Sequence, residues 1–232
     1  MEAKRYAVLA FGGIGNRFGW EKPKQFYPLV HGKTILEYVV EKFVSFDIFN
    51  SFIVVSPKEY ISEVESLIRH IRHNIHIIPG GNAREYSIWN AVLFLNNIAK
   101  DDDIVLIHDG VRPLVSKELV VENIEKCEKF GAAVTAMNSI DTISLSEDGL
   151  KIQEIIPRSK VYLHQTPQTF KYGIIKDAME RAKDALDKFS DDASIVLACG
   201  YDVYYVNGTK ANFKITTIED VNVAKQILSQ DK

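Results

Sequence analysis

Residues 5–19, RYAVLAFGGIGNRFG, decide the fold of this chain. Their first part, Arg5 to Phe11, is a short apolar run that ends in glycines, which is typical of a buried strand. A glycine loop directly after a strand brings backbone amides close to a phosphate. Helical spacing follows in Thr34 to Phe46, with Thr34 as the expected N-cap, and Ser51 to Val55 is again strand-like. The chain therefore begins with a strand–loop–helix–strand unit.

The same alternation of strands and helices runs through most of the sequence. We expect helices at 59–71, 84–95, 117–130, 172–186, 191–199 and 218–228, and strands at 76–78, 103–108, 132–137, 202–206 and in FKITT, 213–217. Alternating strands and helices predict the α/β class, here a three-layer sandwich around a mostly parallel sheet. Ligands of such sheets bind at the carboxyl ends of the strands.

The alternation breaks between Asn138 and Phe170. Here SIDTISLSEDGLKIQEII, residues 139–156, is rich in strand formers and carries a turn signal at Glu147-Asp148-Gly149. We expect a hairpin arm at 138–160. An isolated two-stranded ribbon is only marginally stable, so this arm is either a lid or a dimerisation element. Because the sequence contains no linker or repeat, we expect one domain, 1–232, with the arm inside it.

Composition excludes several classes of protein. The 232 residues include 28 Lys and Arg against 31 Asp and Glu, and the net charge of −3 argues against a nucleic-acid or membrane-surface binder. Cys127 and Cys199 lie too far apart for a zinc motif and form no disulfide framework. No apolar run approaches the ~18 residues of a spanning helix, and no signal peptide is recognisable. We therefore expect a cytoplasmic protein without nucleic-acid or membrane partners.

The glycine loop differs from two well-known phosphate-binding loops. A dinucleotide fingerprint requires glycine where Phe18 stands and an acidic residue near Val55-Ser56-Pro57, and a P-loop requires glycine at Tyr27. What remains is a glycine loop with two cations, Arg17 and Lys24. This combination suits a triphosphate, whose charge preorganised donors must neutralise. The alternative is a plain glycine turn with two surface basic residues.

The pattern G-G-x-G-x-R, followed by P-K-Q, resembles the signature of the cytidylyltransferases that act on sugar-alcohol phosphates. Further motifs resemble the same family in the same order: GGNAR at 80–84 with Ser87, HDGVRP at 108–113, DT at 141–142, PR at 157–158, QTPQ at 165–168, SDDAS at 190–194 and NFKIT at 212–216. The resemblance covers nearly the whole chain. It implies a Rossmann-like sheet of the nucleotide-diphospho-sugar transferase type.

The resemblance also implies the reaction, in which CTP and a polyol phosphate give a CDP-polyol and pyrophosphate. The substrate's own phosphate oxygen attacks the α-phosphorus, so no protein nucleophile is required. Catalysis is then expected from Arg17, Lys24 and Lys214, with Mg²⁺ as a cofactor on the CTP phosphates. For Lys214 the alternative is an exposed strand lysine.

Family positions match two groups of binding residues. The backbone of Phe11, Gly12, Gly13 and Gly15 is expected to hold the triphosphate, and the cytosine and ribose are expected to lie against Gly81, Asn82, Arg84 and Ser87. Gly80-Gly81 could instead be a plain turn before a helix. The family's positions for binding the second substrate, the polyol phosphate, correspond to Asp109, Arg112, Thr142, Arg158, Thr166 and Ser190.

Some of these residues have other interpretations. Asp109 could bind substrate hydroxyls or the metal, or it could form an ion pair with Arg112 that closes the loop. Ser190 could serve only as an N-cap. We interpret His108 as a packed strand-end histidine rather than a base. In the family the arm that carries Thr142 and Arg158 reaches the partner subunit's site, which implies a homodimer with arm exchange.

The identity of the acceptor stays open between two polyol phosphates. Gly12 to Gly15 and Ile140 to Ile143 look more like enzymes of D-ribitol 5-phosphate, whereas Ser190 to Ser194 looks more like those of 2-C-methyl-D-erythritol 4-phosphate. We favour ribitol 5-phosphate slightly, which implies teichoic acid or polysaccharide synthesis; methylerythritol phosphate implies isoprenoid synthesis.

Phe11 departs from the family, which has alanine there. Alternatives are a nucleotidyltransferase for a sugar 1-phosphate and a non-catalytic nucleotide-binding relative.

Overall fold

The structure of the protein, a computed structural model, describes residues 3–12 and 18–230. A seven-stranded sheet forms its centre, and the strand order is β3-β2-β1-β4-β8-β5-β9. The strands are β1 (Arg5–Ala10), β2 (Ser51–Ser56), β3 (Ile75–Pro79), β4 (Ile104–Asp109), β5 (Ala132–Asn138), β8 (Tyr162–Lys171) and β9 (Tyr204–Asn207). All neighbours pair in parallel except β8, which is antiparallel to both β4 and β5. The predicted α/β class with a mostly parallel sheet is confirmed.

Helices cover both faces of the sheet, which gives the expected three layers. One apolar cluster joins the sheet to α1 (Ile35–Ser45), α2 (Ile61–Ile68), α4 (Lys117–Phe130) and α7 (Ile218–Gln230). A second joins the opposite face to α3 (Arg84–Leu95), α5 (Tyr172–Ala182) and α6 (Asp192–Ala198). Leu9 belongs to the first cluster and Val8 to the second, so β1 is buried on both faces. This is why its sequence is a continuous apolar run rather than an alternation.

The first helix begins where the sequence indicated. The Oγ1 atom of Thr34 accepts a hydrogen bond from the amide of Glu37, and the carboxylate of Glu37 accepts one from the amide of Thr34 at 2.8 Å. This reciprocal capping box satisfies amides that the first helical turn leaves unpaired. The predicted N-cap is confirmed.

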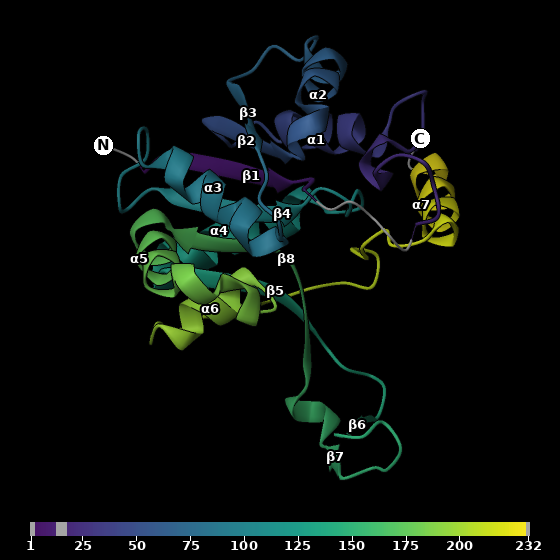
Figure 1. Cartoon of the computed structure of the whole chain (residues 1–232), viewed down its shortest axis with the longest axis vertical. Helices are drawn as coiled ribbons and strands as arrows, with labels where there is room; N and C mark the ends of the chain where they lie inside the picture. Colours follow the sequence, from purple (N-terminus) through teal and green to yellow (C-terminus); the bar gives the residue numbers. More distant parts are fainter. Residues whose placement is uncertain (1–2, 13–17, 231–232) are drawn as a thin grey trace.

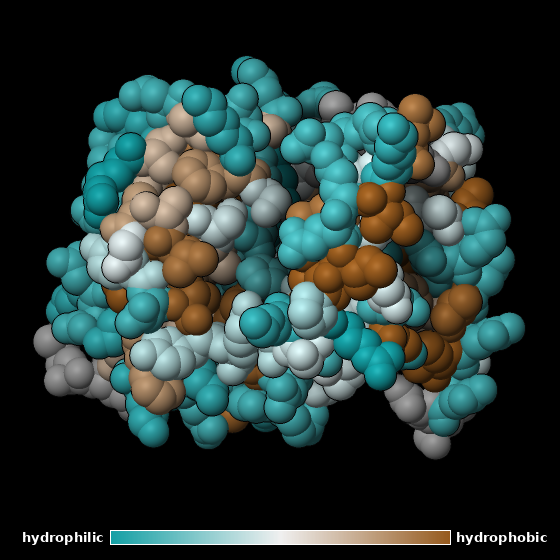
Figure 2. All heavy atoms as spheres, turned by 90° about the horizontal axis from the view of Figure 1, so that it is seen from below, coloured by the Kyte–Doolittle hydropathy of each residue, from teal (hydrophilic) through white to brown (hydrophobic). Residues whose placement is uncertain are grey.

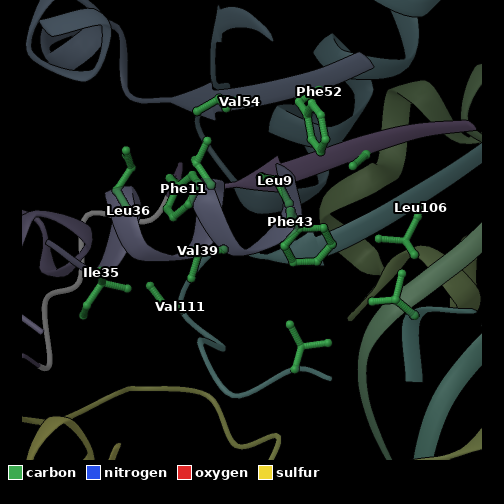
Figure 3. Packing of buried hydrophobic residues seen from close by; sticks show 14 of the residues in the cluster. Leu9, Phe11, Ile35, Leu36, Val39, Phe43, Phe52, Val54, Leu106 and Val111 are labelled. Atoms are coloured by element: carbon green, nitrogen blue, oxygen red, sulfur yellow. The ribbon is translucent and has the colours of Figure 1, made fainter. Parts of the chain in front are cut away.

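Phe11 turns its side chain into the core, where it lies near Leu36 and Val54 (Figure 3). The ring occupies space that the neighbouring loop leaves open. A Cβ atom added at Gly110 would lie only 2.2 Å from Cε1 of Phe11. The bulky residue after β1 is therefore accommodated because residue 110 has no side chain.

The arm projects away from the sheet and its helices (Figure 1). It contains β6 (Ile143–Leu145) and β7 (Glu154–Ile156), which form a separate antiparallel pair, and a short 3₁₀ helix at Arg158–Lys160. Gly149 has a φ of 69°, which fits the turn expected there. The hairpin expected within 138–160 is present.

Some predicted elements were wrong. Residues 213–217 form no strand; this segment crosses the carboxyl edge of the sheet, where the amide of Ile215 donates to the carbonyl of Val111 at 2.9 Å. Three further 3₁₀ helices, Lys24–Phe26, Lys58–Tyr60 and Lys183–Lys188, stand where a loop or a longer α-helix was expected. None of the helices among residues 3–12 and 18–230 is long and apolar enough to span a membrane.

Candidate active site

A cavity of about 310 Å³ opens at the carboxyl edge of the sheet. β4 ends there, and β8 begins there because it runs antiparallel to β4. The segment after β9 crosses the same edge. The lining residues are Arg84, Asp109, Arg112, His164, Gln165, Thr166, Gln168, Ser190, Asp191 and Lys214.

Asp109, the last residue of β4, is the centre of charge in this cavity. Its carboxylate contacts Arg84 Nε at 3.1 Å, Lys214 Nζ at 3.1 Å and Arg112 Nε at 3.4 Å. Burial would raise the pKa of Asp109, but the three cations outweigh it and hold that pKa well below its usual range. The ion pair of Asp109 with Arg112, which the sequence left as an alternative, is present, and Asp109 also pairs with Lys214, about a hundred residues further along the chain.

Arg84 has a second carboxylate partner. Its guanidinium binds the buried Asp192 through two hydrogen bonds, of 2.7 and 3.1 Å. Burial raises the pKa of Asp192, and the paired Arg84 opposes that rise. The side chain of Arg84 thus joins the start of α3 to the start of α6 and faces the cavity around Asp109. Its expected place beside the nucleotide base remains a prediction.

A buried hydrogen-bond chain fixes the end of β4. His108 Nε2 lies 3.1 Å from the carbonyl oxygen of Arg112, which can only accept, so Nε2 carries the proton. The hydroxyl of Thr166 then donates to Nδ1 at 3.1 Å and accepts from the amide of Asp109 at 3.0 Å. Burial lowers the pKa of His108 to about 3, which keeps the ring neutral. The prediction of a packed strand-end histidine is confirmed.

The first loop meets the C-terminal segment at this edge. Lys24 Nζ donates to the carbonyl of Ile215 at 2.8 Å, across 191 residues of sequence, and so lies beside the backbone of Lys214. Gln25, which is buried, donates to the carbonyl of Phe11 at 2.8 Å and fixes the exit of β1. The loop that carries Lys24 is thereby held against the segment that carries Lys214. Arg17, Gly13 and Gly15 lie outside the described residues.

Two glycine segments converge on Ser87. Its Oγ accepts from the amide of Gly81 at 3.0 Å and donates to the carbonyl of Ala83 at 2.9 Å. A Cβ at Gly12 would lie 2.8 Å from this Oγ, so only glycine permits the approach. The exposed Asn82 follows directly, before α3. Gly12, Gly81 and Ser87 therefore lie together, and the nucleotide site expected at these residues and Asn82 remains a prediction.

The predicted acceptor residues fall into two sets. Thr166 and Ser190 line the cavity with Asp109 and Arg112. Thr142 and Arg158 are exposed on the arm and do not line it. The proposal that Ser190 is the N-cap of α6 is wrong, because Asp191 takes that place and accepts from the amide of Ser194 at 2.9 Å.

The sequence interpretation missed His164, Gln165, Gln168 and Asp191, which also line the cavity. Gln165 and Gln168 belong to the motif QTPQ and Asp191 to SDDAS, so a signal for these three was available, but His164 lies in neither motif. No group of three or more His, Cys, Asp or Glu side chains that could hold a metal occurs in the described part of the chain.

A mostly parallel α/β sheet with a cation-rich cavity at its carboxyl edge, beside converging glycine segments, is typical of a nucleotidyltransferase. Residues 6–230 match the family described as 2-C-methyl-D-erythritol 4-phosphate cytidylyltransferase, and the chain belongs to that family. It is therefore a CTP-dependent cytidylyltransferase that acts on a sugar-alcohol phosphate.

Individual relatives agree with this assignment. The chain is 44% identical to the 2-C-methyl-D-erythritol 4-phosphate cytidylyltransferase of Thermosipho africanus (93% of this chain, 94% of the relative) and 46% identical to that of Thermosipho melanesiensis (93% of each). Among solved structures, the 4-diphosphocytidyl-2C-methyl-D-erythritol synthase of Anaerococcus prevotii superposes with a TM-score of 0.84 at 28% identity, over 98% of this chain and 99% of that one. These names do not support the slight preference for ribitol 5-phosphate or the link to teichoic acid.

Proposed function

We propose that the protein transfers CMP from CTP to 2-C-methyl-D-erythritol 4-phosphate, a step of isoprenoid synthesis. One observation carries the proposal furthest. Lys214 lines a cavity together with Asp109, Arg112, Thr166 and Ser190, and Lys24 of the first loop binds the backbone of the next residue, Ile215. The relatives at 44% and 46% identity are named for this acceptor.

The reaction needs positioning and charge neutralisation rather than a protein nucleophile. An oxygen of the acceptor's phosphate forms a bond to the α-phosphorus of CTP, and the bond from that phosphorus to the bridging oxygen breaks, which releases pyrophosphate. Lys24, Lys214 and Arg17 would stabilise the charge that develops in the transition state. The backbone of Phe11, Gly12, Gly13 and Gly15 would hold the triphosphate, and Gly81, Asn82, Arg84 and Ser87 would surround the cytidine.

A divalent cation such as Mg²⁺ would be held mainly by the phosphates of CTP. Both carboxylate oxygens of Asp109 already contact cations, so a metal on Asp109 would have to displace one of them. Mg²⁺ commonly binds through substrate phosphates with few protein ligands, which fits this donor set. When bound, the metal neutralises phosphate charge.

The chain would act as a homodimer that exchanges arms, with residues 1–232 as a single domain and 138–160 as its dimerisation arm. The arm exposes large apolar side chains, among them Ile140, Leu150, Ile152 and Ile155, and Leu150 is 88% exposed. Figure 2, viewed from the side on which the arm projects, has apolar patches between hydrophilic atoms. A second copy would cover this apolar surface, and in the proposed exchange Thr142 and Arg158 of each arm would serve the other copy's cavity.

The test is pyrophosphate release with CTP and Mg²⁺, with 2-C-methyl-D-erythritol 4-phosphate and D-ribitol 5-phosphate in parallel. We expect a higher kcat/KM for methylerythritol phosphate. The reverse order would overturn the proposed acceptor. Release with GTP, UTP or ATP and a sugar 1-phosphate would favour a different nucleotidyltransferase. Tight CTP binding without release for any acceptor would indicate a non-catalytic nucleotide binder.

A further inference from the structure

His164 lies in the cavity but has no part in the function described so far. It belongs to β8, two residues before Thr166, and its side chain is 37% exposed where it lines the cavity. The pairing of β8 with β5 is irregular between His164 and Gln168, and His164, Gln165 and Thr166 all line the cavity there. The imidazole therefore lies on the wall that the acceptor would touch.

Asp191 fixes the orientation of this imidazole. Its Oδ2 lies 2.7 Å from His164 Nδ1 and also accepts from Gln168 Nε2 at 2.9 Å, while Oδ1 caps α6. Burial would raise the pKa of Asp191, but these hydrogen bonds outweigh it and keep the carboxylate ionised. An ionised carboxylate can only accept, so Nδ1 carries a proton. Nε2 is the ring nitrogen that this contact leaves available, and the described residues offer it no hydrogen-bond partner.

The charges in the cavity separate two ends. Arg112 and Lys214 contact Asp109 at one end and attract phosphate. At the other end the carboxylate of Asp191 stands behind His164, which disfavours an anion there. A hydroxyl suits this end better, because it can donate to a neutral Nε2 or accept from a protonated one.

We propose that Nε2 of His164 binds a hydroxyl of the acceptor's polyol chain, and that Asp191 is the positioning residue that holds the ring for this contact. The inference rests on the proposed function, since it requires a polyol phosphate in this cavity. It assigns His164 to recognition of the acceptor and not to recognition of CTP.

Two substitutions separate contact with the acceptor from a structural role. His164→Asn retains an amide that can donate to Asp191 but has no atom at the place of Nε2. His164→Gln places an amide nitrogen near Nε2 and serves as the matched control. Steady-state rates of pyrophosphate release are measured with varied 2-C-methyl-D-erythritol 4-phosphate at saturating CTP, and then with varied CTP at saturating 2-C-methyl-D-erythritol 4-phosphate. The melting temperature of each variant is measured as well.

We expect His164→Asn to raise the KM for methylerythritol phosphate roughly 3- to 10-fold, as for the loss of one hydrogen bond. The KM for CTP should change by less than about 2-fold, and His164→Gln should recover part of the lost affinity. An unchanged acceptor KM in an active His164→Asn protein would overturn this inference alone, and so would equal increases for both substrates. If the unsubstituted protein released no pyrophosphate with any polyol phosphate, the proposed function would fail and this inference with it.

Discussion

Replacing Gly110 by alanine is expected to destabilise the protein, because the new methyl group would enter space that the ring of Phe11 fills. The added Cβ would lie 2.2, 2.3 and 2.5 Å from Cε1, Cδ1 and Cζ of that ring. Ordinary contact begins near 3.4 Å, so the ring or the loop would have to move by about 1 Å. Phe11 is only 1% exposed in the core cluster, which leaves little room for this movement.

The expected loss is about 1–3 kcal/mol of unfolding free energy, the usual cost of overpacking a core. For a chain of this length it corresponds to a fall in melting temperature of roughly 2–12 °C. The measurement is thermal and urea unfolding at one fixed protein concentration, because association would make the midpoints depend on concentration.

A double-mutant cycle identifies the cause. Phe11→Ala should itself cost about 3–5 kcal/mol. In that background Gly110→Ala should be close to neutral, since its methyl group enters a cavity. Gly149→Ala is the control. The φ of 69° at this position is strained for alanine, but an added Cβ would have no atom within 4 Å. Its cost should be the same with or without Phe11. A Gly110→Ala cost that agreed within about 0.3 kcal/mol in both backgrounds would refute the reasoning.

Three other predictions concern catalysis, assembly and pH. Lys24→Ala and Lys214→Ala should each lower kcat by at least ~100-fold with unchanged circular dichroism, as for the loss of a transition-state donor; near-normal pyrophosphate release would remove that lysine from the mechanism. Purified heterodimers of Arg158→Ala and Lys24→Ala chains should regain about half of the normal activity, because one of the two shared sites is intact; no recovery would exclude arm exchange. Burial lowers the pKa of His108 to about 3, against an ordinary value of 6.5. As the pH falls, His108 is therefore protonated in the unfolded state but stays neutral in the folded state. The free energy of unfolding should fall by about 2 kcal/mol from pH 7 to pH 5. His108→Gln should lose this slope in urea titrations, and a slope equal to that of the unsubstituted protein would contradict it.

Local patterns predicted much of the fold. The apolar run from Arg5, the N-cap at Thr34 and the turn at Gly149 all have short-range causes, and all three are present. Residues 213–217 show where such patterns fail. Their alternation resembles a strand, but the segment spans the edge of the sheet and pairs with a loop. Strand propensity reflects packing and partners as much as residue type.

The antiparallel direction of β8 could not be predicted from local sequence patterns either, and it determines which residues line the cavity. Because β8 enters the sheet between β4 and β5, its first residues lie at the edge where β4 ends. This insertion brings Thr166 against Asp109 and places His164 in the cavity. The resemblance to a family supplied Thr166 by position, but no pattern in the sequence indicated the role of His164.

The sequence by itself determined the class of sheet, the arm, the glycine segments and the cationic residues, because these depend on residue type and on periods of two to four positions. The tertiary structure decided which of those residues meet. Lys24 reaches the backbone at Ile215, and Arg84 lies between Asp109 and Asp192, across separations that no local period encodes. Strand order and register set these distances, and they follow from how the whole chain buries its two apolar clusters.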